Sequence, residues 1–89
     1  MKHIIKNSGY SELYSRDKYK NSILKTLLAV PVPQQQAHII ADAMCHTTDK
    51  WLHNKHEVSS LDIRVFTQKQ LAEHNADAAL LYKKYGNIW

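Results

Sequence analysis

The amino-acid sequence predicts an α+β fold that is mostly α: an N-terminal β-hairpin lid over a compact four-helix arrangement. The run Asn7-Ser8-Gly9 separates two short stretches that can form strands. Apolar residues recur at helical spacing in four later segments, with Ser, Pro or Asn at their boundaries. We therefore expect one domain over residues 1–89, with the hairpin over about 3–14 and helices over about 16–29, 34–53, 60–74 and 76–85.

The hairpin and the first helix follow from local signals. Asn and Gly tolerate positive φ, which a tight hairpin turn requires. Ser15 is a candidate N-cap for the first helix, and Val30-Pro31-Val32-Pro33 ends that helix. The expected buried stripe of the helix consists of Tyr19, Ile23, Leu24, Leu27 and Leu28.

The second helix is the longest. Pro33 suits its first turn, and small residues at positions 37, 41 and 43 predict close approach of a neighbouring helix. Its expected common face consists of Ala37, Ile40, Ala41, Met44, Thr48, Trp51 and Leu52.

The third and fourth helices also carry start signals. Ser59 and Asp62 resemble a capping box, and Asn75 can cap the last helix. Gly86 is a C-terminal stop. The residues of the third helix that are expected to face inward are Ile63, Phe66 and Leu71. The fourth helix is expected to contain Ala78, Ala79, Leu81, Tyr82 and Tyr85.

Composition limits the function classes. The formal net charge of +4 favours anionic ligands or partners. No RNA-binding motif, zinc-finger spacing or basic run supports nucleic-acid binding, although a small basic helical nucleic-acid binder is an alternative that predicts salt-dependent DNA binding. The N-terminus resembles no secretory signal, no run is long enough to span a membrane, and the single Cys45 fits a reducing cytoplasm.

Neither metal binding nor catalysis is predicted. His46, His53 and His56 lack a Cys or second carboxylate at recognisable ligand spacing. A catalytic nucleophile needs an adjacent base and an orienting group, and neither accompanies Ser59, Ser60 or Cys45. We therefore expect a non-catalytic protein without a metal site of its own.

Five short motifs, in order along the chain, resemble one known family. They are Ile4-Ile5-Lys6-Asn7-Ser8-Gly9, the run from Glu12 to Lys18, Asn21-Ser22-Ile23-Leu24-Lys25, Glu57-Val58-Ser59-Ser60-Leu61-Asp62-Ile63, and Ala79 with Tyr82 and Tyr85. Together they resemble the ATP-cone domain, the N-terminal nucleotide-sensing module of ribonucleotide reductases, which also occurs in their transcriptional repressor. The resemblance covers the chain from about Ile4 to Tyr85.

The resemblance implies a regulatory module that binds ATP or dATP under a hairpin lid. By a conformational shift it would signal which nucleotide is bound to a regulated partner such as a ribonucleotide reductase. Lys6 would reach the phosphates, Ile4 would cover the adenine or pack in the hairpin core, and Glu12 would lie near the base and ribose. Mg²⁺ would arrive with the triphosphate. The implied nucleotide-binding set is Ile4, Lys6, Asn7, Glu12, Lys18, Ser60, Arg64, Lys83 and Lys84.

Departures from the family pattern favour an alternative. The family opens with Val-x-Lys-Arg-Asp-Gly, and this chain has Asn7 and Ser8 at the Arg and Asp positions. Loss of one charge-assisted hydrogen bond weakens binding by about ten- to a hundredfold. The alternative is therefore a degenerate cone that acts as a protein-interaction module, with a docking edge around Ile88 and Trp89. Convergence of Lys6, Lys18 and Arg64 on one cavity would favour nucleotide binding.

Overall fold

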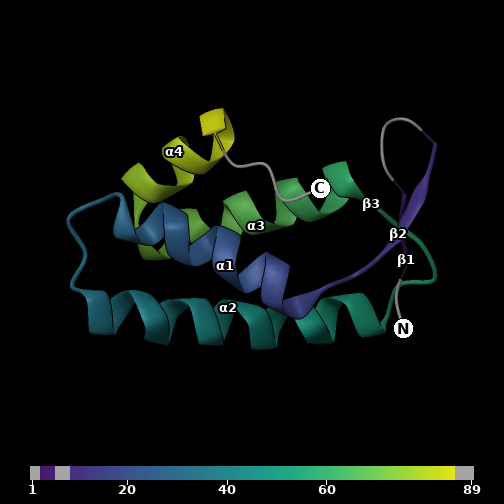
Figure 1. The fold of residues 1–89 in the computed structure, drawn as a ribbon, viewed down its shortest axis with the longest axis horizontal. Coiled ribbons are helices and arrows are strands. Elements are labelled where there is room, and N and C mark those ends of the chain that lie inside the picture. Colours follow the sequence, from purple (N-terminus) through teal and green to yellow (C-terminus); the bar gives the residue numbers. More distant parts are fainter. Residues whose placement is uncertain (1–2, 6–8, 86–89) are drawn as a thin grey trace.

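The computed structural model describes residues 3–5 and 9–85 and contains four helices and a small three-stranded sheet (Figure 1). Its helical content of 72% confirms the predicted α+β, mostly α, fold class. In chain order the elements are β1 (His3–Ile5), β2 (Ser11–Leu13), α1 (Arg16–Leu28), α2 (Gln34–His53), β3 (Val58–Ser59), α3 (Ser60–His74) and α4 (Ala76–Tyr85).

The sheet has the strand order β2-β1-β3, so the N-terminal strand lies in its middle. Ile4 of β1 is opposite Glu12 in the antiparallel pair with β2 and opposite Val58 in the parallel pair with β3. Gly9 has a φ of 88°, which a residue with a side chain rarely adopts. The sequence predicted only the hairpin and interpreted residues 57–63 as a helix entry. A two-residue strand has no periodicity that would reveal it.

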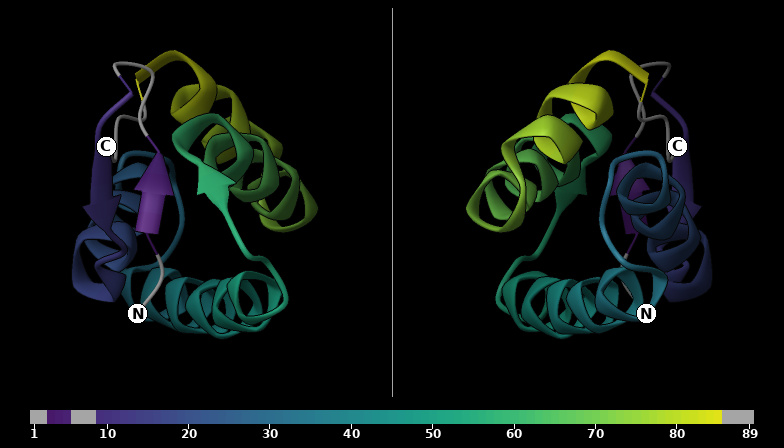
Figure 2. Two further views of the ribbon diagram at one scale, coloured as in Figure 1. Left: turned by 90° about the vertical axis from the view of Figure 1, so that its right-hand side faces the viewer. Right: turned by 90° about the vertical axis from the view of Figure 1, so that its left-hand side faces the viewer.

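The helices surround one core. Figure 2 shows α3 and α4 side by side, with α2 crossing beneath the other helices. The helix α4 also contacts α1. The sheet contributes Ile4 and Val58 to this core, so it closes one end of the helical arrangement. The largest wholly buried side chains from the helices are Tyr19, Ile23, Leu27, Met44, Ile63, Leu71 and Tyr82.

Three predicted helix caps are confirmed. Ser15 Oγ accepts a hydrogen bond from the Lys18 N–H at 3.2 Å, and Asn75 Oδ1 accepts one from the Ala78 N–H at 2.9 Å. Ser59 and Asp62 form both hydrogen bonds of a capping box. Such caps satisfy backbone groups that the helix itself leaves unbonded, and each typically contributes about 1 kcal/mol.

A network of buried hydroxyl groups joins three helices. The Tyr19 hydroxyl of α1 lies 3.0 Å from Thr48 Oγ1 of α2 and 2.6 Å from Thr67 Oγ1 of α3. Gln70 Nε2 donates a hydrogen bond to Thr48 Oγ1 at 3.1 Å. Because hydrogen bonds are directional, this network fixes the relative positions of α1, α2 and α3 more narrowly than apolar packing does.

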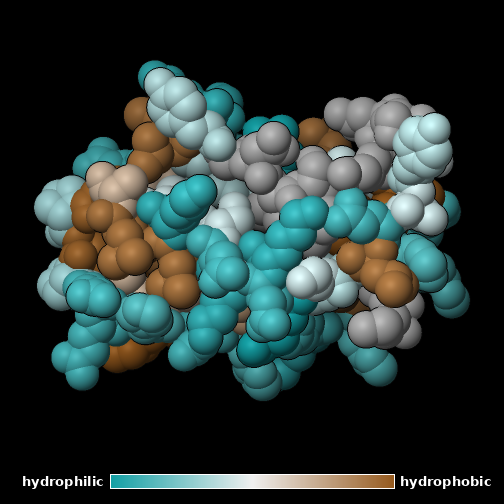
Figure 3. All heavy atoms as spheres, in the orientation of Figure 1, coloured by the Kyte–Doolittle hydropathy of each residue, from teal (hydrophilic) through white to brown (hydrophobic). Residues whose placement is uncertain are grey.

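Some predictions about the inner faces of the helices are wrong. Leu28, predicted to lie in the buried stripe of α1, is exposed because it stands at the last turn of the helix. Ala43 of α2, predicted to allow close approach of a neighbouring helix, faces solvent. Phe66 is half-buried and stacks on Trp51 with ring centroids 4.2 Å apart. Apolar surface gathers at the end where α1 meets the α1–α2 connection, the left end of Figure 3. None of the described helices is both long and apolar enough to cross a membrane.

Candidate functional site

The sheet brings the starts of α1 and α3 to one end of the molecule (Figure 1). β2 leads into α1 through Tyr14 and Ser15, while β3 continues directly into α3. Since β2 and β3 flank the same central strand, both helices begin beside the sheet. A helix N-terminus presents N–H groups and a partial positive charge, which attract anions.

Glu12 and Lys18, two of the predicted site residues, are in direct contact. Lys18 Nζ lies 2.8 Å from Glu12 Oε1, and this ion pair joins β2 to the first turn of α1. The Lys18 side chain is 45% exposed and the Glu12 side chain is 33% exposed. Exposed pairs contribute only about 0–1 kcal/mol to stability, so another negative charge can compete for Lys18 at little cost.

Ser60, Arg64 and the end of α4 form a second group of predicted residues. Ser60 is the buried first residue of α3, and Arg64 is exposed one turn later. Burial raises the pKa of Tyr82 in α4, and the positive charge of Arg64 lowers it in part. Lys83 and Lys84 are exposed in the turn that follows.

Tyr82 is a residue whose place the sequence did not indicate. The sequence placed it only in the fourth helix and in the Ala-x-x-Tyr-x-x-Tyr spacing. The structure buries its side chain in the core, and this burial raises the pKa of its hydroxyl.

The hairpin residues of the predicted site are placed only in part. Ile4 is wholly buried in the core, between Glu12 and Val58 in the sheet, which agrees with its alternative role in hairpin packing. Its role over the adenine remains a prediction. Lys6 and Asn7 lie outside the described residues, as do Ser8, Gly86, Ile88 and Trp89.

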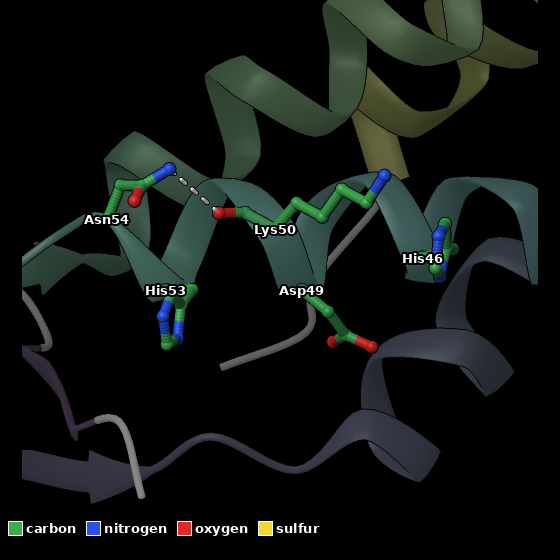
Figure 4. Close-up of a pocket in the computed structure, with 5 residues that line it drawn as sticks. All are labelled: His46, Asp49, Lys50, His53 and Asn54. Carbon is green, nitrogen blue, oxygen red and sulfur yellow. Dashed lines mark hydrogen bonds between the residues drawn. The ribbon is translucent and has the colours of Figure 1, made fainter.

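A separate hollow of about 420 Å³ lies on α2 and is lined by His46, Asp49, Lys50, His53 and Asn54 (Figure 4). Its charged groups do not converge. Asp49 and His53 point to one side of the helix and the Lys50 amine to the other. Asp49 Oδ2 accepts a hydrogen bond from Arg16 Nε at 2.9 Å, which raises the pKa of Arg16.

Among the residues that the structure describes, neither the possible metal ligands nor the cysteine thiol is arranged for chemistry. Within residues 3–5 and 9–85, no group of three His, Cys, Asp or Glu side chains could hold a metal ion. Burial raises the pKa of the Cys45 thiol, so that thiol stays protonated at neutral pH. A buried, protonated cysteine is a poor nucleophile.

The family model described as the ATP cone domain matches residues 2–88. The chain belongs to the ATP-cone family. This confirms the resemblance seen in the sequence motifs and extends it over essentially the whole chain. ATP cones are nucleotide-sensing regulatory domains that in general bind ATP or dATP. No curated protein matches the chain.

In this ATP cone the described candidate residues form two groups on the two sides of β1. Glu12 and Lys18 belong to β2 and α1 on one side. Ser60 and Arg64 belong to α3 on the other, with Lys83 and Lys84 on the helix that packs against it. The central strand β1 thus lies between the elements that carry Glu12 and Lys18 and the helix that carries Ser60 and Arg64.

Proposed function

We propose that this ATP cone is a non-catalytic regulatory module that binds ATP or dATP and signals the bound state to a partner by a conformational shift. The sheet order β2-β1-β3 is the observation that carries the proposal, since it anchors the starts of α1 and α3 beside one strand. The proposed ligand contacts are those that the family pattern implies: Ile4, Lys6, Asn7, Glu12, Lys18, Ser60, Arg64, Lys83 and Lys84.

Charge supports a phosphate ligand. Lys18 stands on the first turn of α1 and Arg64 one turn into α3, and Lys83 and Lys84 add positive charge from the last turn of α4. Arg64 can bind a phosphate through two parallel N–H donors, whereas lysine acts as a point charge. Mg²⁺ would accompany the triphosphate, because Mg²⁺ at nucleotide sites is bound largely through phosphates and water.

The Glu12–Lys18 ion pair supplies a candidate conformational element. In the described state it holds β2 against α1. A phosphate that attracts Lys18 would weaken this contact and change the position of the hairpin relative to α1. Binding and hairpin position would then be linked, because a ligand favours whichever conformation it contacts better. The regulated partner, a ribonucleotide reductase or another cytoplasmic protein, would recognise one of the two conformations.

Isothermal titration calorimetry with ATP, dATP and AMP, with and without Mg²⁺, tests the proposal. Arg64→Ala is compared with Lys69→Ala, which removes another exposed cation from α3. Lys18→Ala is compared with Lys25→Ala on α1. We expect the two site variants to weaken binding by about ten- to a hundredfold and the two controls by less than about twofold.

An amide NMR titration of the unchanged chain locates the site independently. Saturable shifts should cluster at Glu12, Lys18 and Ser60–Arg64. Shifts confined to α2, or equal losses in site and control variants, would contradict the proposal.

The second candidate is a cone that has lost nucleotide binding and acts only as an interaction module. Asn7 and Ser8 favour it, because the family pattern has Arg and Asp at those positions. Absence of any heat or amide shift at millimolar ATP would support this candidate and exclude the first.

A further inference from the structure

The four helices form two closely packed pairs. The helix α1 packs most extensively against α2, and α3 packs most extensively against α4. Because α1 also contacts α4 and α2 also contacts α3, α1 and α3 lie diagonally across the core from each other. The first pair carries Lys18, whereas the second pair carries Ser60, Arg64, Lys83 and Lys84. The candidate nucleotide contacts on the helices are thus divided between two packed units.

A hydrogen bond joins the two pairs along this diagonal. The Tyr19 hydroxyl of α1 lies 2.6 Å from Thr67 Oγ1 of α3, and both side chains are wholly buried. A second hydrogen bond between the pairs runs from Gln70 Nε2 of α3 to Thr48 Oγ1 of α2 at 3.1 Å. Since Thr48 Oγ1 also lies 3.0 Å from the Tyr19 hydroxyl, these contacts form one connected network. Such a network holds its members at defined distances and angles, whereas apolar side chains can slide past one another.

The network lies close along the chain to two of the candidate ligand contacts. Lys18 directly precedes Tyr19, and Arg64 precedes Thr67 by three residues, which is less than one helical turn. Over so short a span of α-helix, the position of each cation's backbone follows that of its buried neighbour. The separation between the backbones of Lys18 and Arg64 therefore depends on the hydrogen bond between Tyr19 and Thr67.

We propose that Tyr19 and Thr67 are positioning residues of the nucleotide site, and that their hydrogen bond sets the separation between the helix pair that carries Lys18 and the pair that carries Arg64. The consequence for ligand affinity rests on the proposed function, whereas the consequence for the helix pairs does not. Both residues act from the interior, because both are wholly buried. When the hydrogen bond is lost, the pairs sample more than one separation. Only the fraction of molecules with the native separation then binds nucleotide with full affinity.

Three substitutions of buried threonines distinguish positioning from a general loss of stability. Thr67→Val removes the hydroxyl and keeps the shape of the side chain, whereas Thr67→Ser keeps the hydroxyl and removes a methyl group. Thr26→Val is the matched control on α1. The Thr26 hydroxyl is also buried, but it donates a hydrogen bond within its own helix, to the Ser22 carbonyl at 3.1 Å. Circular dichroism checks that each variant is folded at the temperature of the measurements.

Spin labels on α1 and α3 of the full chain report the separation of the two pairs in the absence of nucleotide. Asn21→Cys and Lys69→Cys supply the labelled positions, which are exposed, and Cys45 is buried, so labelling is selective for the new thiols. We expect one narrow distribution of distances in the labelled parent, in Thr67→Ser and in Thr26→Val, and a broader distribution in Thr67→Val. An unchanged distribution in Thr67→Val, or the same broadening in Thr26→Val, would overturn the proposal.

Calorimetry with ATP measures the consequence for the ligand site. Thr67→Val should raise the dissociation constant about tenfold, which corresponds to a binding-competent fraction of about one tenth. The conservative variant Thr67→Ser should restore the affinity, and Thr26→Val should change it by less than about twofold. An unchanged affinity in Thr67→Val, or equal losses in Thr67→Val and Thr67→Ser, would overturn the proposal. If the unchanged chain gives no heat with ATP, the proposed function fails, and the label distances alone decide whether the hydrogen bond positions the helix pairs.

Discussion

The replacement Tyr19→Phe removes one hydroxyl group from the buried network and leaves the ring that packs in the core. The hydroxyl contacts Thr48 Oγ1 at 3.0 Å and Thr67 Oγ1 at 2.6 Å, and all three residues are wholly buried. Each such hydrogen bond contributes about 1 kcal/mol net, and a buried polar group that loses its partner costs about 1–3 kcal/mol. Thr48 keeps its hydrogen bond from Gln70. We therefore expect a loss of about 2–4 kcal/mol in the free energy of unfolding.

Guanidinium unfolding followed by circular dichroism measures this loss, since a domain of this size is expected to unfold in one step. Tyr85→Phe is the matched control, because that tyrosine is 76% exposed and should lose less than about 0.5 kcal/mol.

A double-mutant cycle then separates the network from the ring. In Tyr19→Phe the Thr67 hydroxyl loses its tyrosine partner, and Thr67→Val removes that hydroxyl. The loss of stability in the double variant should therefore be smaller than the sum of the losses in the two single variants. Additive losses, or a loss of less than about 0.5 kcal/mol in Tyr19→Phe, would refute the reasoning.

Three further predictions concern the cap, the ion pair and pH. Ser59→Ala should destabilise the chain by about 1 kcal/mol in thermal unfolding, whereas an unchanged melting temperature would mean that the capping box contributes nothing. Glu12→Gln should weaken ATP binding by about ten- to a hundredfold in calorimetry, because the proposed contact of the carboxylate with the ligand is lost; unchanged or stronger binding would mean that Glu12 is not a ligand contact. Burial raises the pKa of Cys45 above 9.0 and that of Tyr19 above 10.0, so the folded chain keeps protons that the unfolded chain releases. Their contribution to stability is complete below about pH 9 and declines as the pH rises towards the folded-state pKa values, and a guanidinium midpoint that stays constant above pH 9 would contradict it.

The helix starts could be predicted because capping is a local property. Ser15, Ser59 with Asp62, and Asn75 each bond to a backbone N–H within three residues along the chain. The four helices after the hairpin could therefore be predicted from the spacing of apolar residues and from the capping residues. The number of residues that each helix buries could not be predicted, because helical spacing shows which side of a helix faces the core but not how far the core extends along it. Leu28 was predicted to be buried, and is exposed, for that reason.

The features that could not be predicted from the sequence depend on contacts between residues far apart along the chain or in different elements. β3 exists because Val58 and Ser59 lie beside β1, and two residues give no alternation to detect. The Glu12–Lys18 contact joins a strand to a helix, so no helical or strand spacing predicts it. The motif resemblance named both residues as site candidates, but only the structure shows that they bind each other.

The central position of β1 in the sheet has a consequence for biosynthesis. β1 can pair with β2 as soon as both have left the ribosome, because only residues 6–10 separate the two strands along the chain. Its other edge must wait for Val58 and Ser59, since a parallel partner far along the chain forms late and slowly. Until then the backbone groups on that edge of β1 lack their partner strand and can pair with another chain. Translation through α3 is thus what protects the N-terminal strand, and a ribosome stalled within α2 would expose a nascent chain prone to aggregation.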